Sequence, residues 1–141
     1  ITCRDWSSDV CSSDLCHRLI SWQGYAGWAD AAREAMDWYR LADQANPHSP
    51  YPPLRIGMCH DWLGNPSLGR PWYAEALRRD PLSYYVAAIH GWHAVQEGKF
   101  EEARDWFERS LAIKVWPNPI ADRYLRIVKR KLAETPPASP P

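Results

Sequence analysis

The feature that most constrains this chain is an aromatic pair that recurs every 34 residues. Trp38-Tyr39 is followed by Trp72-Tyr73 and then by Trp106-Phe107, and the same interval links Asn46-Pro47 to Asp80-Pro81. Around these landmarks apolar residues fall at spacings of three and four, which is the period of a helix. The sequence therefore predicts an all-α protein made of repeats that bury their apolar faces against one another.

Turn and capping signals divide the chain into six expected helices. Proline disfavours helical backbone in the residue before it, so Asn46-Pro47 ends the first helix, and Ser83 is a favourable N-cap. Because Pro71 has no N–H to donate, its helix is expected to start only near Arg70. The expected helices run from Trp28 to Ala45, Tyr51 to Leu63, Arg70 to Arg79, Tyr84 to Glu97, Phe100 to Ile113 and Pro119 to Ala133.

Two sets of apolar residues are expected to be internal. The last helix, capped by Asn118, carries an apolar stripe that should close the end of the repeat stack. The three tryptophans of the aromatic pairs, Trp38, Trp72 and Trp106, are predicted to form a buried ladder between successive hairpins. The stripe consists of Ile120, Ala121, Tyr124, Leu125, Val128 and Leu132.

These positions resemble the tetratricopeptide repeat (TPR), a family with small residues at three set positions, an aromatic residue and a closing proline. The last full repeat supplies Gly91, Ala103, Phe107 and Ser110; the middle one supplies Gly57, Gly69, Tyr73, Ala76 and Pro81; the first matches at Ala35, Tyr39, Ala42 and Pro47. The resemblance implies a TPR-type α-solenoid of antiparallel helical hairpins with a C-terminal capping helix, and a non-catalytic interaction module.

In that family, set positions of the first helices line a concave groove that binds the partner. The corresponding surface here is aromatic and apolar with one acid, which suits an apolar peptide or helix, or sugar rings stacked on aromatic side chains. It lacks the Lys and Asn of a carboxylate-clamp adaptor. The alternative is that these residues simply cover a short solenoid. The partner-binding candidates are Tyr51, Leu54, Met58, Asp61, Tyr85, Ala88, Trp92 and Val95.

Other kinds of site find little support. His90 and His93 stand near neither a second histidine pair nor a cysteine pair at zinc spacing, so no metal site is expected. Cofactor and catalytic motifs are also absent from the sequence, and no enzyme activity is expected of this chain. Its formal charge of zero does not suggest a nucleic-acid partner. No stretch reaches the length of a membrane span.

The two ends of the chain are expected to lie outside the repeats. Residues 5–15 match the translation of a common sequencing adapter, so residues 1–15 are interpreted as an artefact that precedes a truncated chain; a genuine Ser/Asp-rich tail is the alternative. Residues 16–134 are expected to form the solenoid, with about 2.5–3 repeats plus a capping helix, and the first helix of the first repeat would cover Cys16 to about Asp30. The tail 135–141, rich in proline, should be disordered.

Several strings resemble a narrower family, the C-terminal repeats of bacterial O-antigen ligase/polymerase-like membrane proteins. They are Ala35 to Tyr39, Arg55 to Gly64, Ser83 to Tyr85, Gly91 to His93 and Asn118 to Ala121. The resemblance implies an extracytoplasmic domain whose parent transfers or polymerises glycans, and none of the catalytic residues has a counterpart here. The alternatives are a cytoplasmic scaffold that binds a protein, and a repeat domain fused to an unrelated enzyme.

Overall fold

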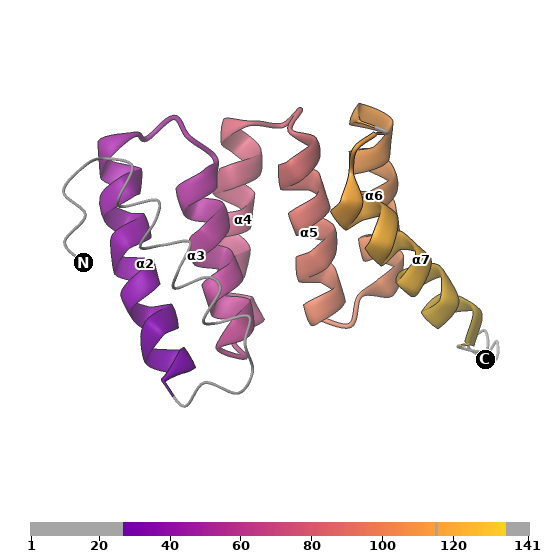
Figure 1. Cartoon of the computed structure of the whole chain (residues 1–141), viewed down its shortest axis with the longest axis horizontal. Coiled ribbons are helices and arrows are strands. Elements are labelled where there is room, and N and C mark those ends of the chain that lie inside the picture. Colours follow the sequence, from indigo (N-terminus) through magenta and orange to yellow (C-terminus); the bar gives the residue numbers. More distant parts are fainter. Residues whose placement is uncertain (1–26, 115, 135–141) are drawn as a thin grey trace. The chain divides into compact units, whose positions relative to one another are not determined.

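The computed structural model describes residues 27–114 and 116–134, which form six helices and no strand (Figure 1). The all-α prediction is confirmed. The predictions for residues 1–15, for the segment from Cys16 to residue 26 and for the tail 135–141 lie outside the described residues. The helices are α2 (Trp28–Ala45), α3 (Tyr51–Trp62), α4 (Pro66–Arg79), α5 (Tyr84–Gln96), α6 (Phe100–Ile113) and α7 (Pro119–Glu134).

The chain divides into two compact units, which meet in sequence between Arg79 and Asp80. Unit 1 contains α2, α3 and α4. Its α3–α4 hairpin depends on glycine, because a Cβ on Gly57 would lie 2.8 Å from the ring of Tyr73. A Cβ on Gly69 would lie 3.0 Å from the carbonyl oxygen of Gly57. Without these two side chains the helices approach closely, and the buried Tyr73 ring fills the contact.

Helix α2 packs against this hairpin through small and medium-sized side chains. Their spacing of three and four puts them on one side of the helix, as the sequence predicts. Partly buried side chains pack against this cluster, among them those of Trp62, Leu63 and Trp72. The buried members of the cluster are Ala32, Ala35, Met36, Tyr39, Ile56 and Cys59.

The start of α4 differs from the prediction. The helix begins at Pro66 and runs through Pro71, whereas the sequence predicted a start near Arg70. Pro66 at the first position loses no helical hydrogen bond, and the carbonyl that Pro71 leaves without a donor belongs to the solvent-exposed Ser67. The close contact of Gly69 with α3 anchors this turn, so tertiary packing outweighs the local cost of Pro71.

Arg79, at the end of α4, connects several polar groups of unit 1 through ion pairs and a hydrogen bond. Its guanidinium forms ion pairs with Asp43 of α2 and with Glu75 one turn earlier. It also donates to the carbonyl oxygen of Ser49 at 2.9 Å. One largely buried side chain thus connects α4 to the end of α2 and to the α2–α3 loop.

Unit 2 repeats the hairpin 34 residues later with α5 and α6. A Cβ on Gly91 would lie 2.7 Å from the Phe107 ring, so the glycine–aromatic contact is the same device. The predicted N-cap at Ser83 is confirmed, since its Oγ accepts from the N–H of Val86 at 3.3 Å. Asn118 Nδ2 donates to Ser110 Oγ and to the Lys114 carbonyl oxygen, both at 2.9 Å, which fixes the turn into α7.

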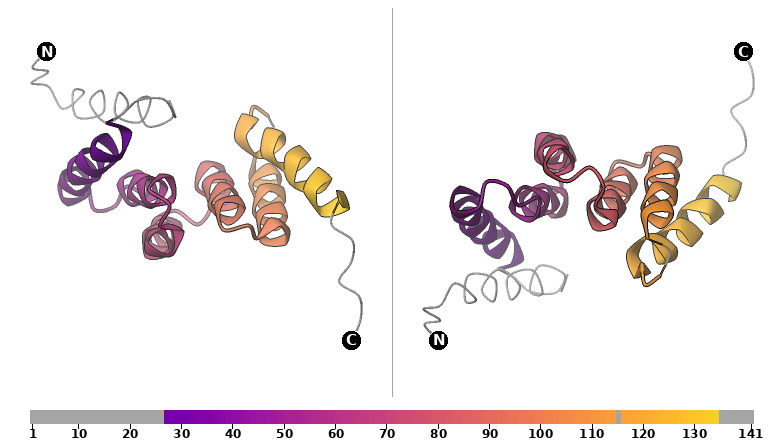
Figure 2. Two further views of the ribbon diagram at one scale, coloured as in Figure 1. Left: turned by 90° about the horizontal axis from the view of Figure 1, so that it is seen from below. Right: turned by 90° about the horizontal axis from the view of Figure 1, so that it is seen from above.

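Helix α7 packs on α6 and touches α5, and it crosses α6 at an angle (Figure 2). The predicted apolar stripe is confirmed in full. Ala121 and Val128 are buried, and the four partly buried residues pack on the same cluster, which also contains Ala88, Ala94, Ala103 and Phe107. The partly buried members of the stripe are Ile120, Tyr124, Leu125 and Leu132.

The predicted tryptophan ladder is wrong by one residue. The second member of each pair is buried, namely Tyr39, Tyr73 and Phe107. Trp38 is 38% exposed, and Trp72 and Trp106 are half-buried. One residue turns a helix by about 100°, so the two rings of a pair point in different directions, and in each pair the second ring is the buried one. In the two hairpins with a glycine–ring contact, Tyr73 and Phe107 occupy the central position, and the preceding Trp72 and Trp106 are only half-buried.

Candidate interaction site

Four of the predicted partner-binding residues lie on α5, a helix without a single Asp, Glu, Lys or Arg. Tyr85 and Trp92 are half-buried, and seven residues apart they share a face of the helix. Trp92 and Val95 pack with one side against the apolar cluster of unit 2, while Ala88 is part of that cluster. The accessible surface of this face is therefore supplied by three half-buried side chains, those of Tyr85, Trp92 and Val95.

The other four predicted residues lie on α3 in unit 1, and most of them point inward. Tyr51, the first residue of the helix, is 52% exposed, whereas Leu54 and Met58 are buried. Asp61 is also buried and accepts a 2.6 Å hydrogen bond from the phenol of Tyr73. Of this group only Tyr51 offers a large surface to a partner.

The Asp61–Tyr73 pair has an apolar counterpart in the next repeat. The residues 34 positions later are Val95 and Phe107, which pack in the same cluster. A carboxylate facing a phenol is thus replaced by an aliphatic side chain and a phenyl ring. This difference between the two repeats indicates that Asp61 serves as the hydrogen-bond acceptor for the Tyr73 hydroxyl inside the hairpin. The sequence analysis did not assign that role to Asp61.

Sequence reasoning did not predict the surroundings of Trp106. The ring of His90 stacks on the indole with centroids 4.5 Å apart, and the Arg109 guanidinium lies 5.0 Å from the indole centroid. Arg109 also donates to the carbonyl oxygen of Pro81 at 3.1 Å. Glu102, Asp105, Trp106 and Arg109 line a hollow of about 300 Å³. The one signal in the sequence was the tryptophan itself, which the buried-ladder prediction had placed inside.

The histidines have separate surroundings. His90 stacks on Trp106, and His93 Nε2 lies 3.8 Å from Glu97 Oε2, which also pairs with Lys99 at 2.8 Å. Burial lowers the pKa of His60; Arg40 acts in the same direction and Asp61 in the opposite one. Within residues 27–114 and 116–134, no three His, Cys, Asp or Glu side chains gather closely enough to hold a metal ion.

Comparison with known proteins identifies the architecture. The first TPR of Spaghetti (RPAP3), bound to an HSP90 peptide, superposes with a TM-score of 0.68 at 20% identity, covering 92% of this chain and 98% of that one. The Sgt2 TPR domain from Aspergillus fumigatus gives 0.70 at 16% identity, covering 95% and 88%. This chain has the tetratricopeptide-repeat fold.

A third TPR-like neighbour is PcrH in complex with the chaperone-binding region of PopD. Its TM-score is 0.59 at 19% identity, with 93% of this chain and 99% of that chain covered. No protein-family model matches the chain, and no curated protein matches it either. At these identities the likeness establishes the TPR fold alone.

Proposed function

We propose that this chain is a TPR interaction module that binds a protein segment through the face of α5 that carries Tyr85 and Trp92. The observation that carries the proposal is the pair of half-buried rings, Tyr85 and Trp92, on a helix that has no Asp, Glu, Lys or Arg. The neighbours with peptide or protein partners, RPAP3 and PcrH, support the general class.

The chemistry of this face favours an apolar or aromatic segment. Tyrosine and tryptophan gain most from burial of their rings, and their polar edges can still bond to a peptide backbone. These two rings lie about two helical turns apart. That spacing matches an amphipathic helix that presents residues at a similar interval. Leu54, Met58, Asp61 and Ala88 are buried, so each contributes to the packed interior of its own unit and offers almost no surface to a partner.

Selection from a peptide-display library, followed by titration calorimetry on the selected peptide, tests this function. We expect apolar, aromatic sequences to be enriched. The double variant Tyr85→Ala with Trp92→Ala should weaken binding by more than tenfold, since each buried aromatic contact contributes on the order of 1–2 kcal/mol. Helical circular dichroism should be retained.

The matched control is Trp116→Ala, which removes a tryptophan that is 85% exposed and lies between α6 and α7. It should bind the selected peptide like the wild type. A glycan array run with the same proteins tests sugar stacking as the alternative. Selected peptides that bind the double variant as tightly as the wild type would show that the α5 face is not the site.

We also propose, from the sequence strings that resemble O-antigen ligase/polymerase-like proteins, that the module belongs to a longer membrane protein of that kind. None of the described helices is long and apolar enough to cross a membrane. Extending the coding sequence upstream tests this: a series of hydrophobic spans would support it, and further 34-residue repeats would favour a scaffold protein.

A further inference from the structure

Helix α7 carries five cations, and three of them already have ionic partners. Arg126 pairs with Asp122 at 3.0 Å, Lys129 with Glu108 of α6 at 3.0 Å, and Lys131 with Glu134 at 3.5 Å. Arg123 and Arg130 are exposed and have no ion pair or hydrogen bond within the described residues. The unpaired positive charge of α7 is therefore confined to two positions.

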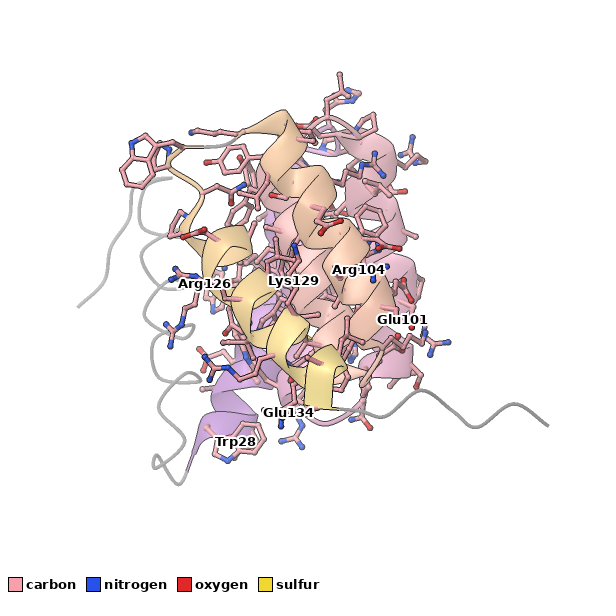
Figure 3. All side chains as sticks on the ribbon, turned by 90° about the vertical axis from the view of Figure 1, so that its right-hand side faces the viewer. Trp28, Glu101, Arg104, Arg126, Lys129 and Glu134 are labelled. Atoms are coloured by element: carbon pink, nitrogen blue, oxygen red, sulfur yellow. The ribbon has the colours of Figure 1, made fainter. Side chains whose placement is uncertain are left out.

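Those two arginines flank an exposed apolar residue. Arg123, Ile127 and Arg130 follow a spacing of four and three, so they share one face of the helix, and Ile127 is 42% exposed. This α7 stripe lies opposite the buried Ala121 and Val128. In Figure 3, Lys129 instead lies where α7 meets α6, in keeping with its bond to Glu108.

Helix α2 shows the complementary pattern. Of its four acids, Asp30 pairs with Arg33 at 2.8 Å, Asp37 with Arg40 at 2.7 Å, and Asp43 with Arg79. Glu34 is exposed and has no such partner among the described residues. It lies four and seven residues before Trp38 and Leu41, which are 38% and 55% exposed. These three residues form the α2 stripe, on the side of the helix away from Ala32 and Ala35.

We propose that the α7 stripe of one copy docks on the α2 stripe of a second copy. Glu34 meets one of the two arginines, Ile127 packs against the exposed apolar side chains, and a guanidinium can lie over the Trp38 indole. No ion pair seen among the described residues has to be broken, because Glu34, Arg123 and Arg130 have no ionic partner there. This contact is separate from the α5 face and goes beyond the proposed function.

The two surfaces are different, so the contact is heterologous and adds copies head to tail. A contact between two single-helix faces is smaller than a standard stable interface. The association should therefore be weak, dependent on concentration and reduced by salt. A lipid surface fits the α7 stripe less well, since it presents a single aliphatic residue.

Sedimentation equilibrium of the full chain from micromolar to millimolar concentration tests the proposal. The average mass should rise with concentration. Arg123→Ala with Arg130→Ala should weaken association at least tenfold, as should Glu34→Ala with Leu41→Ala. The matched control, Arg126→Ala with Lys129→Ala, removes the same charge from the same helix and should associate like the wild type. Circular dichroism confirms that each variant is folded.

A charge exchange makes the test specific. The single variant Glu34→Arg should remain monomeric by itself, and so should the double variant Arg123→Glu with Arg130→Glu. A mixture of these two proteins should associate again. Three results would overturn the proposal: a constant monomer mass for the wild type, equal loss in the stripe and control variants, or failure of the mixture to associate while the wild type does so.

Discussion

At the scale of single residues, the two described hairpins use the same contact between a glycine and an aromatic ring. Gly57 faces Tyr73, and Gly91 faces Phe107, in both cases at distances that exclude a Cβ. Helix propensity alone disfavours glycine at both positions. Its use there is explained by the ring, which occupies the space that a side chain would need.

A double-mutant cycle tests this contact. Gly91→Ala should destabilise unit 2 by about 1–3 kcal/mol, as overpacking does in other cores. Combining it with Phe107→Leu should cost less than the sum of the two single changes, because the smaller side chain makes room for the methyl group. Urea unfolding of the four proteins gives the free energies of unfolding that the cycle compares. Strict additivity would mean that the ring and the glycine do not constrain each other.

The Asp61–Tyr73 pair gives a second prediction. Tyr73→Phe removes the hydroxyl that bonds the buried carboxylate and should cost about 1–3 kcal/mol. The double change Asp61→Val with Tyr73→Phe copies the Val95–Phe107 arrangement of the next repeat and should be more stable than either single variant. Thermal unfolding of the double variant and of both single variants measures these stabilities. A double variant less stable than both singles would assign the carboxylate a role other than satisfying the phenol.

Sequence reasoning at this scale identified the right residue types and missed one orientation. The resemblance to the TPR family correctly assigned contact positions to the small residues and to Tyr73 and Phe107. The 34-residue period alone could not distinguish the two members of each aromatic pair, because both recur at that interval, are large and apolar, and differ only by a 100° turn of the helix. The burial of Leu54, Met58 and Asp61 depends on how closely the helices pack, which a single sequence does not reveal.

At the scale of helices, the termini follow local signals except where packing intervenes. The extent of α2 and the Ser83 cap agree with prediction. Helix α4 starts four residues earlier than expected, since Gly69 and Tyr73 hold its first turn against α3. Local rules for proline describe an isolated helix and do not include the stabilisation from a neighbouring one.

The end of α4 gives an electrostatic prediction. Hydrogen bonds from Arg78 and then Arg79 lower the pKa of Glu75 from 4.5 to about 2. A carboxyl with a lowered folded-state pKa stabilises the fold above pH 4.5 and loses that contribution as the pH falls toward 2. Carboxyl NMR shifts should therefore show Glu75 titrating near the lower value.

The effect on stability should be small, because the pair is partly exposed and screened. Stability of the Glu75→Gln variant should fall less than that of the wild type across the same pH range. Identical pH profiles, or a Glu75 titration close to 4.5, would mean that the arginines do not hold the carboxylate in solution.

At the scale of the whole molecule, the chain comprises two compact units with the TPR fold. The fold was predictable from one number, the 34-residue interval, because a repeat length fixes the size of the hairpin and hence the kind of stack. The partner was not predictable in the same way. The repeat pattern specifies the core, whereas the surface residues that choose a partner vary freely around it.

An NMR titration shows whether the α5 face binds a protein segment. The labelled chain would be titrated with a peptide selected from the display library, and backbone shifts followed along unit 2. The account predicts that the largest shifts fall on α5 around Tyr85 and Trp92, with little change on the Glu101–Arg109 side of α6. Shifts concentrated on α6, with α5 unchanged, would contradict it.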